Sequence, residues 1–371
     1  MVGGRNEPRE TTWERVDAMI AIDMDRALSF LVALLQTPSP TGFHQEAIAL
    51  VEEELRALSV PGLDLLRTRK GALVATVTGR GSGEPRGLSA HVDTLGAMVR
   101  EVKANGRLLL TQLGGYAWNA VEGENVTVHC LRNGGRYRGT LQTVNPSVHT
   151  SRQAGDEGKR EEERMEVRID ARTTSKQETL ALGIDVGDIV SFDPRVEITD
   201  TGFIKSRHLD DKAGVAVLYA TLLTLKQAGL MPARRTTFLF SNYEEVGHGA
   251  VGFPPDLAEL LVVDMAASTT GEHQNSDEYS VGICAKDSGT GPYDLEMRQR
   301  LVKLCEEQHI PFKIDTYPFY GSDGSFLLKT AADVQVGLIG PGLDASHGYE
   351  RTHRDSIEAT VRLVVHYLLK E

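Results

Sequence analysis

The sequence predicts an α/β fold in which helices cover both faces of a mixed sheet and a small β-barrel-like domain interrupts it. Strand-like and helix-like segments alternate on both sides of the middle third of the chain, which is typical of a covered sheet. Between about residues 100 and 203 the pattern changes to short apolar runs separated by glycines and charges, which is typical of a small barrel. The 371 residues also exceed the usual size of a single hydrophobic core. We therefore expect an extension over residues 1–20, a main domain in two parts, 21–99 and 204–371, and an inserted barrel-like domain over 100–203.

The first part of the main domain begins with two expected helices. Residues 24–36 have the apolar spacing of an amphipathic helix, and the segment Thr37-Pro-Ser-Pro-Thr-Gly42 ends it. A second helical pattern runs from Phe43 to Leu55. Residues 72–77 then have the composition of a strand, and residues 87–90 form a strand that leads directly into a histidine.

The inserted region and the second part of the main domain differ in the length of their expected elements. The insert contains short strand-like runs and one almost wholly charged stretch, 156–164, which we expect to be a solvated loop. The second part returns to longer units, with a helix over 212–228 that ends at Gly229. The short runs of the insert are 108–110, 126–130, 137–144, 165–169 and 189–192, and the longer units that follow are strands at 236–240, 260–263 and 334–339 and helices at 295–308 and 357–369.

Composition and charge exclude several classes of function. The 52 acidic and 40 basic side chains give a net charge of -12, which argues against a general nucleic-acid or anionic-membrane surface. The longest apolar stretch near the start is far shorter than the roughly 20 residues of a membrane helix, and no secretory leader is evident. The three cysteines, Cys130, Cys284 and Cys305, are too scattered for a disulfide framework or a zinc knuckle. We expect a cytoplasmic protein without nucleic-acid or membrane partners.

Five side chains of metal-binding type follow strand-like runs. They are His91, Asp210, Glu245, Asp264 and His347. Because the carboxyl ends of parallel strands meet at one edge of an open sheet, these side chains are expected to converge there. Without metal, their carboxylates would form a like-charge cluster with raised pKa values. The pattern therefore predicts a hydrolytic site that holds two divalent cations.

Asp210 is the expected bridge between the two cations, because a carboxylate has two oxygens and a histidine nitrogen cannot bridge. Three carboxylate ligands contribute a charge of -3 against +4 from two divalent cations, and a hydroxide would make the site neutral. Asp211 is either part of this site or an acid at a helix N-terminus, where the helix dipole favours it.

Two further acids have expected roles beside the ligands. Glu244 directly precedes Glu245 after a strand, so one carboxylate can bind metal while the other handles a proton. Asp93 lies two residues after His91 and could orient its imidazole from the far side. The last ligand is less constrained, since His353 is a rival to His347. Mixed nitrogen and oxygen ligands suit zinc or cobalt, and also manganese, and such a pair of cations can activate water for hydrolysis.

The ordered motifs resemble the family of dinuclear metallo-aminopeptidases that includes the tetrahedral and glutamyl aminopeptidases, some of which carry the name endoglucanase. The matching pieces span almost the whole chain. They are Thr37-Pro-Ser-Pro-Thr-Gly42, His91-Val-Asp93, Gly187-Asp188, Asp210-Asp-Lys212, Glu244-Glu-Val-Gly247, Val263-Asp264, Gly321-Ser-Asp-Gly324 and the late histidine.

The resemblance implies a zinc-peptidase-like fold and an aminopeptidase that cleaves the N-terminal bond of short peptides. It implies that His91, Asp210 and Asp264 hold one metal, and Asp210, Glu245 and His347 the other. Glu244 would be the general base and Asp93 a supporting residue. The resemblance also implies a hollow homo-oligomer, a dodecamer, in which the inserted domain serves assembly and substrate access.

One segment departs from the family pattern. Ser346-His-Gly-Tyr-Glu-Arg-Thr-His353 is not the common His-Ser-Pro form and more resembles a bacterial branch linked with the osmoprotectant N-acetylglutaminylglutamine amide. Two alternatives follow. One is a related carboxypeptidase or deacylase acting on a modified glutamine dipeptide, for which Lys286 or Arg351 would anchor a carboxylate. The other is a non-catalytic peptide-binding relative.

Overall fold

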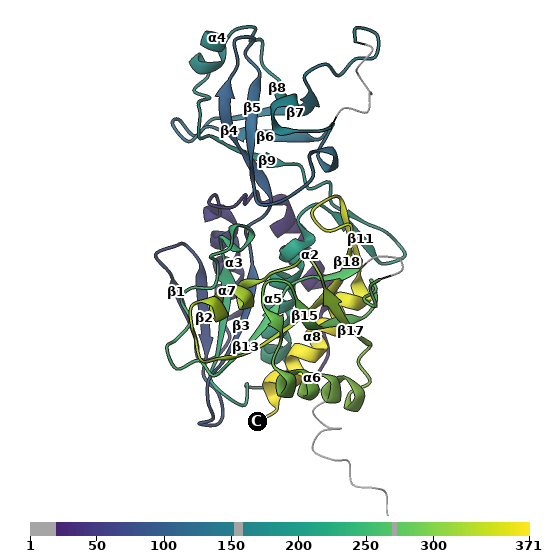
Figure 1. The fold of residues 1–371 in the computed structure, drawn as a ribbon. Coiled ribbons are helices and arrows are strands. Elements are labelled where there is room, and N and C mark those ends of the chain that lie inside the picture. The colour runs from purple at the N-terminus through teal and green to yellow at the C-terminus, as the bar shows by residue number, and fades with distance from the viewer. Residues whose placement is uncertain (1–19, 152–158, 269–272) are drawn as a thin grey trace, which may run out of the picture.

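A sheet-based main domain and a closed barrel make up the protein, with the barrel standing above the sheet in Figure 1. The computed structural model describes residues 20–151, 159–268 and 273–371. The expected extension therefore lies outside the described residues except for Ile20, and so do residues 156–158 of the expected charged loop. The prediction of a mixed, helix-covered sheet interrupted by a small barrel is confirmed.

The main sheet has 13 strands within the described residues. Its centre is parallel, in the order β12-β3-β13-β18, and antiparallel strands extend it on both sides. The carboxyl ends of four central strands therefore share one edge. In chain order the strands are β1 Leu63–Arg67, β2 Leu73–Val77, β3 Arg86–His91, β10 Glu197–Ile198, β11 Phe203–Ser206, β12 Thr236–Ser241, β13 Glu259–Val263, β14 Ala266–Ser268, β15 Val281–Asp287, β16 Gly291–Pro292, β17 Phe312–Tyr317, β18 Gln335–Asp344 and β19 Glu350–His353.

Helices cover both faces of this sheet because the central strands are apolar on both sides. In β13, Leu261 and Val263 belong to the main core, whereas Leu260 and Val262 belong to a second cluster on the opposite face. The main core is built with the longer helices, and α7 covers the second cluster. The helices are α2 Met24–Gln36, α3 Gln45–Leu58, α5 Leu209–Ala228, α6 Leu295–Glu307, α7 Asp323–Lys329 and α8 Arg354–Leu369.

The helix α5 is the most deeply buried of these elements. Every residue from Leu209 to Leu225 is buried, so this helix has no solvent-exposed face over that range, unlike an amphipathic surface helix. It ends at Gly229 in the left-handed conformation, as predicted. Its backbone is not helical at Asp210 and Asp211, so the regular helix begins after these two acids.

The inserted barrel is closed by six strands in the order β4-β5-β8-β7-β6-β9. Its interior is filled by alternating apolar residues such as Val126 and Val128. Its strands run from Gly96 to Phe192, and β10 already pairs with the main sheet, so the expected boundaries at 100 and 203 remain a proposal for how the chain divides into domains. The elements are β4 Gly96–Val102, β5 Leu108–Leu113, β6 Asn125–His129, β7 Arg136–Thr143, β8 Met165–Ile169, β9 Ile189–Phe192 and α4 Lys176–Ala181, with single turns of 3-10 helix at η1 Trp118–Ala120 and η2 Glu162–Arg164, and at η3 Glu244–Val246 in the main domain.

A buried arginine joins the barrel to the main domain. Arg207 pairs with Glu124 of the barrel at 2.8 Å and donates to the backbone carbonyls of Ala120 and Gly348. The barrel is therefore tied to the loop that carries the last expected ligand.

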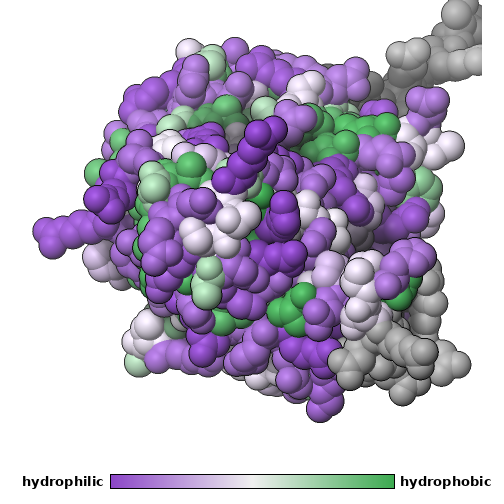
Figure 2. Space-filling view, turned by 90° about the horizontal axis from the view of Figure 1, so that it is seen from above, coloured by the Kyte–Doolittle hydropathy of each residue, from purple (hydrophilic) through white to green (hydrophobic). Residues whose placement is uncertain are grey.

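Other expectations concern the surface and the cysteines. Cys130, Cys284 and Cys305 are free and buried. Among the described residues, no helix is both long and apolar enough to cross a membrane. Seen from the barrel end, the surface is mainly hydrophilic with a few separate apolar patches (Figure 2).

Candidate metal centre

The five predicted ligands meet at the carboxyl edge of the parallel strands. His91 is the last residue of β3, Asp264 directly follows β13, and Glu245 lies in η3 after β12. Asp210 lies at the start of α5, and His347 lies in the loop between β18 and β19. The structure therefore brings together residues that are spread over more than 250 positions of the chain.

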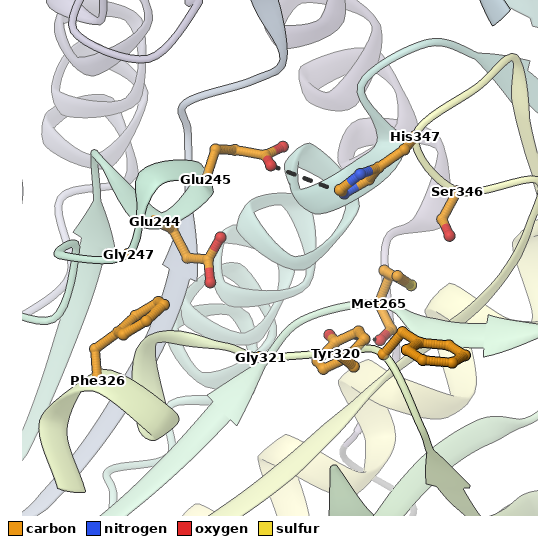
Figure 3. A pocket seen from close by; sticks show the side chains of 10 residues that line it. Glu244, Glu245, Gly247, Met265, Tyr320, Gly321, Phe326, Ser346 and His347 are labelled. Carbon is orange, nitrogen blue, oxygen red and sulfur yellow. Dashed lines mark hydrogen bonds and ion pairs between the residues drawn. The ribbon is translucent and has the colours of Figure 1, made fainter. Parts of the chain in front are cut away.

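Asp210 lies between the two histidines. Its Oδ1 is 3.2 Å from Nε2 of His91, and its Oδ2 is 3.4 Å from Nε2 of His347. The same nitrogen of His347 is 3.8 Å from Oε2 of Glu245, and Figure 3 shows these two side chains facing each other. One carboxylate oxygen directed at each histidine is the arrangement expected of a bridging group.

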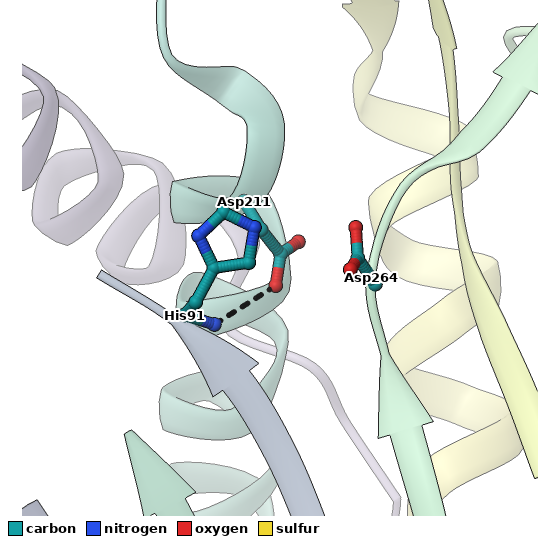
Figure 4. A group of neighbouring side chains, drawn as sticks. All are labelled: His91, Asp211 and Asp264. Carbon is teal, nitrogen blue, oxygen red and sulfur yellow. Dashed lines mark hydrogen bonds between the residues drawn. The ribbon is translucent and has the colours of Figure 1, made fainter. Parts of the chain in front are cut away.

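Asp264 and Asp211 complete the other side of the cluster. His91, Asp211 and Asp264 offer ligand atoms that lie within 4.8 Å of one another (Figure 4), and so do His91, Asp210 and Glu245. Asp211 also accepts hydrogen bonds from the backbone N–H of Gly214, at 3.1 Å, and of His91, at 3.2 Å. Asp211 therefore caps the first regular turn of α5 and ties it to the end of β3, which favours the helix-acid interpretation.

The pKa values of the acids in the cluster are strongly shifted. Burial, followed by the charge of neighbouring acids, raises the pKa of Glu245 to about 8 and that of Asp264 to about 7. Burial also raises the pKa of Glu244 well above its ordinary value. Burial would raise the pKa of Asp210 too, but hydrogen bonds from His347 and His91 outweigh it and lower that pKa. Crowded carboxylates with raised pKa values are what the sequence predicted for this site in the absence of a cation.

The pKa values of the two histidines are raised as well, although burial acts on them in the opposite direction. Burial alone would lower the pKa of His91, but Asp210 and the surrounding acids raise it well above its ordinary value. For His347 the same competition raises the pKa to about 10. Two protons thus supply the positive charge that the acids require, in the place where cations would supply it.

Asp93 acts on the site in a different way from the one expected. Nδ1 of His91 is 2.8 Å from the backbone carbonyl of Asp93, whereas its carboxylate is 3.7 Å away. The carboxylate instead accepts from the backbone N–H groups of Glu244 and Glu245, at 3.2 and 3.3 Å, and from the hydroxyl of Thr41. The backbone of Asp93 therefore orients His91, and its side chain holds the turn that carries the two glutamates.

His347, and not His353, lies at the cluster. Nε2 of His353 is 2.8 Å from the carbonyl of Thr201, and its Nδ1 accepts from the backbone N–H of Asp355 at the start of α8. Nδ1 of His347 lies close to the carbonyl of Gly115 in the loop after β5. Because a carbonyl only accepts, this contact fixes the proton on Nδ1 and directs Nε2 toward Asp210.

Glu350 holds the His347 loop against the start of α5. Its Oε1 accepts from the backbone N–H of His347 and its Oε2 from the backbone N–H of Asp210, each at 3.0 Å. Glu350 is buried. One carboxylate thus sets the distance between Asp210 and His347.

The donor set fits divalent cations. Both histidines have Nδ1 engaged by a carbonyl, which leaves Nε2 of each directed into the cluster. Oε1 of Glu245 is buried and has no hydrogen-bond partner within the described residues, which is unfavourable unless a cation binds there. Imidazole nitrogens and carboxylate oxygens together suit zinc, cobalt or manganese.

A cavity of about 360 Å³ opens beside the cluster. Glu244, Glu245 and His347 line one side of it (Figure 3). Its lining contains no lysine or arginine among the described residues. The proposed carboxylate anchors do not reach it, because Lys286 donates to the carbonyl of Asp287 and Arg351 pairs with Glu278.

A family model described as M42 glutamyl aminopeptidase matches residues 71–363, which include all five predicted ligands. The chain belongs to the M42 family. YhfE of Bacillus subtilis (strain 168), provisionally named an aminopeptidase, is 46% identical over 344 residues that cover 92% of this chain and 97% of YhfE. This M42 chain is therefore a peptidase, and the recognition from its motifs is confirmed.

Solved structures support the fold of this M42 member. The TET aminopeptidase of the marine sediment archaeon Thaumarchaeota archaeon SCGC AB-539-E09 superposes with a TM-score of 0.83 at 18% identity, over 93% of this chain and 96% of that one. The TET1 peptidase of Pyrococcus horikoshii gives a TM-score of 0.77 at 20% identity, over 93% and 100%. That peptidase is described as assembling into a tetrahedron or a large octahedral shell.

Proposed function

We propose that this chain is a metal-dependent aminopeptidase that removes the N-terminal residue of short peptides at a pair of divalent cations. His91, Asp210 and Asp264 would hold one cation, and Asp210, Glu245 and His347 the other. The observation that carries the proposal is the position of Asp210, with one oxygen directed at each histidine. Zinc or cobalt suits this donor set best, and manganese is the third candidate.

Glu244 is the proposed general base. When bound, the two cations would lower the pKa of a water and stabilise negative charge on the scissile carbonyl. Glu244 lines the cavity, and its Oε2 is 3.8 Å from Nε2 of His91. Its carboxylate takes a proton from the attacking water and delivers it to the leaving amine.

Asp93 is the proposed positioning residue for this base. Its carboxylate accepts from the backbone N–H of Glu244 and of Glu245, so it fixes the turn rather than the proton. Asp93 is fully buried. It therefore sets where the general base and one ligand stand relative to β3.

The charge of the cavity favours a free amine over a carboxylate as the anchored end of the substrate. Its lining carries acids and a histidine but no lysine or arginine among the described residues. A carboxypeptidase would have to bury the substrate carboxylate without a basic partner, which is costly. A positively charged amino terminus has acidic partners in the same cavity.

A homo-oligomer, by likeness a dodecamer, is the proposed assembly. The support is the described assembly of the TET1 peptidase and the exposed apolar residues of the barrel. Leu131, Val148 and Val186 of the inserted region are 59%, 66% and 61% exposed. Light scattering behind size-exclusion chromatography tests this, since a monomer in solution would contradict it.

The activity is tested with a tripeptide that begins with leucine, its N-acetylated form and its C-amidated form. Metal-loaded protein should release the first residue of the free and the amidated peptide but not of the acetylated one. The Glu244→Gln variant should bind the same number of cations and lose turnover by about 10²- to 10⁴-fold. Glu278→Gln, a buried glutamate outside the cavity, is the matched control and should keep activity. Cleavage of only the acetylated peptide would indicate a deacylase instead.

A further inference from the structure

The cavity beside the metal centre has two unlike walls. One wall carries the proposed ligands and base. The opposite wall is apolar and is formed mainly by Met265, Phe319, Tyr320 and Phe326. Figure 3 shows Phe326 and Tyr320 across the cavity from Glu245 and His347.

The apolar wall is fixed to the catalytic turn. The ring of Phe326 lies against Gly247, where an added Cβ would lie 3.1 Å from Cε1 of the ring. Gly247 has φ of +83°, so glycine is favoured there for its backbone as well as for the space. The apolar wall therefore stands at a set distance from Glu244 and Glu245, which flank the same turn.

No free polar group on this wall is suited to an acidic side chain. The hydroxyl of Tyr320 already donates to the carbonyl of Met265 at 2.9 Å. Nζ of Lys329 is 5.2 Å from the ring centroid of Phe326, but Lys329 is exposed and does not line the cavity. A glutamate side chain placed here would lose water and gain no partner.

Phe319 extends the apolar wall into solvent. It is 97% exposed, the highest value among the exposed large apolar residues of the described chain. Its ring lines the cavity next to Tyr320. Apolar surface that a bound side chain covers contributes about 25 cal/mol per Å² removed from water, so a large apolar substrate gains from this ring and a small one does not.

We propose that the apolar wall receives the side chain of the N-terminal residue and that this chain selects large apolar residues, such as leucine, methionine or phenylalanine, over glutamate. The inference rests on the proposed aminopeptidase function. It departs from the glutamyl name of the family model, because the lining of this cavity among the described residues holds no lysine or arginine to pair with a glutamate, and its histidine is a proposed metal ligand. Phe319 and Phe326 are the specificity-determining residues.

The test is a panel of 4-nitroanilides of leucine, phenylalanine, alanine, lysine and glutamate with the metal-loaded protein. We expect kcat/KM for leucine to exceed that for glutamate by at least about 100-fold and that for alanine by about 10-fold or more. A glutamate substrate cleaved as well as leucine would overturn the specificity. Hydrolysis of none of the five would contradict the aminopeptidase function itself, so the two failures are distinguishable.

Variants assign the selectivity to the wall. Phe326→Ala and Phe319→Ala should each lower kcat/KM for leucine and phenylalanine by about 10-fold while changing alanine by less than about 3-fold. Leu66→Ala, which removes an apolar side chain that is 63% exposed outside the cavity, is the control and should change none of them. An equal loss on all substrates would overturn the assignment of these residues.

A binding measurement separates recognition from turnover. Metal-loaded Glu244→Gln should bind leucinamide more tightly than glutamic acid α-amide in isothermal titration calorimetry. Lys329→Met should leave this order unchanged. If glutamate binds more tightly and Lys329→Met removes that preference, Lys329 is the recognition group and the inference is wrong.

Discussion

The two halves of the proposed metal centre are built in different ways. The His91 half is part of the sheet: its histidine ends β3, its acid follows β13, and the side chain of His91 is only 2% exposed. The His347 half lies on a loop, and the side chain of His347 is 39% exposed. Asp210 is common to both.

The two halves differ in the groups that orient their histidines. His91 is oriented by the carbonyl of Asp93, two residues away on the same strand end. His347 is oriented by Gly115, which belongs to the barrel, and by Glu350. The first half is therefore formed by the folding of the sheet, whereas the second also requires the barrel to be in place. On this account the first half should bind a cation more tightly.

The largest effect is expected where the halves meet. Asp210→Ala removes the group that both cations would share, so both should be lost. The value of kcat/KM should fall by more than about 10³-fold, which exceeds the 10- to 100-fold typical of residues that only orient a ligand. Inductively coupled plasma mass spectrometry measures the metal content, and hydrolysis of a leucyl substrate measures the loss of kcat/KM. One retained cation would show that the halves are independent.

Removing each histidine in turn should lower the free energy of unfolding by different amounts. In the metal-free protein, His91→Ala opens a cavity among buried acids and should cost about 2–4 kcal/mol. His347→Ala leaves a more solvated gap and should cost less than about 2 kcal/mol. Urea unfolding of both variants tests this, and equal losses would contradict the comparison. With excess metal, His347→Ala should still bind one cation.

Glu350→Gln should weaken the second half more than the first. One of its two oxygens becomes an amide that cannot accept, so either Asp210 or His347 loses its backbone contact. We expect the affinity for the second cation to fall by roughly 10- to 100-fold and that for the first to change little. Calorimetric titration of zinc into metal-free protein resolves the two steps. Equal weakening of both steps would show that Glu350 supports the whole centre.

The effect expected farthest from the ligands is a pH dependence of the barrel. Burial, followed by the charge of Arg136, lowers the pKa of His129 to about 4. The unfolded chain, with an ordinary pKa near 6.5, binds the proton more readily, so stability is complete above about pH 6.5 and is lost as the pH falls toward 4. At pH 5 the loss is about 2 kcal/mol.

His129 lies near the junction of the barrel and the main domain, since its ring centroid is 4.7 Å from that of Phe43 in the main domain. Urea unfolding at pH 7 and pH 5 measures the dependence, and His129→Gln should flatten it. If His129→Gln leaves the pH dependence of stability unchanged, other groups cause the loss of stability at pH 5. If the barrel supports the second half, cation binding there should weaken over the same pH range.

The sequence predicted all five proposed ligands, whereas it predicted their supporting groups only where the contact is local. His91, Glu244, Glu245 and Asp264 each follow a recognisable strand, and the helices at 24–36 and 212–228 and the strand at 189–192 lie where their apolar patterns place them. The main sheet was also predictable, because its central strands are continuous apolar runs. Asp93 was found by its spacing, although its carboxylate holds a backbone turn rather than an imidazole.

The supporting groups of the second half could not be found in this way. Glu350 acts on Asp210 from 140 residues away and Gly115 on His347 from 232 residues away, and neither has a local pattern that marks it. Short elements such as α7 and β14 were missed because too few residues define a period.

The most direct test of the account is anomalous scattering from crystals of the zinc-loaded protein. We predict two peaks, one on each side of the Asp210 carboxylate. The first should lie about 2.0–2.2 Å from Nε2 of His91 and from Asp264, and the second at the same distance from Nε2 of His347 and from Glu245. A single peak, or two peaks that do not share Asp210, would contradict the proposed centre.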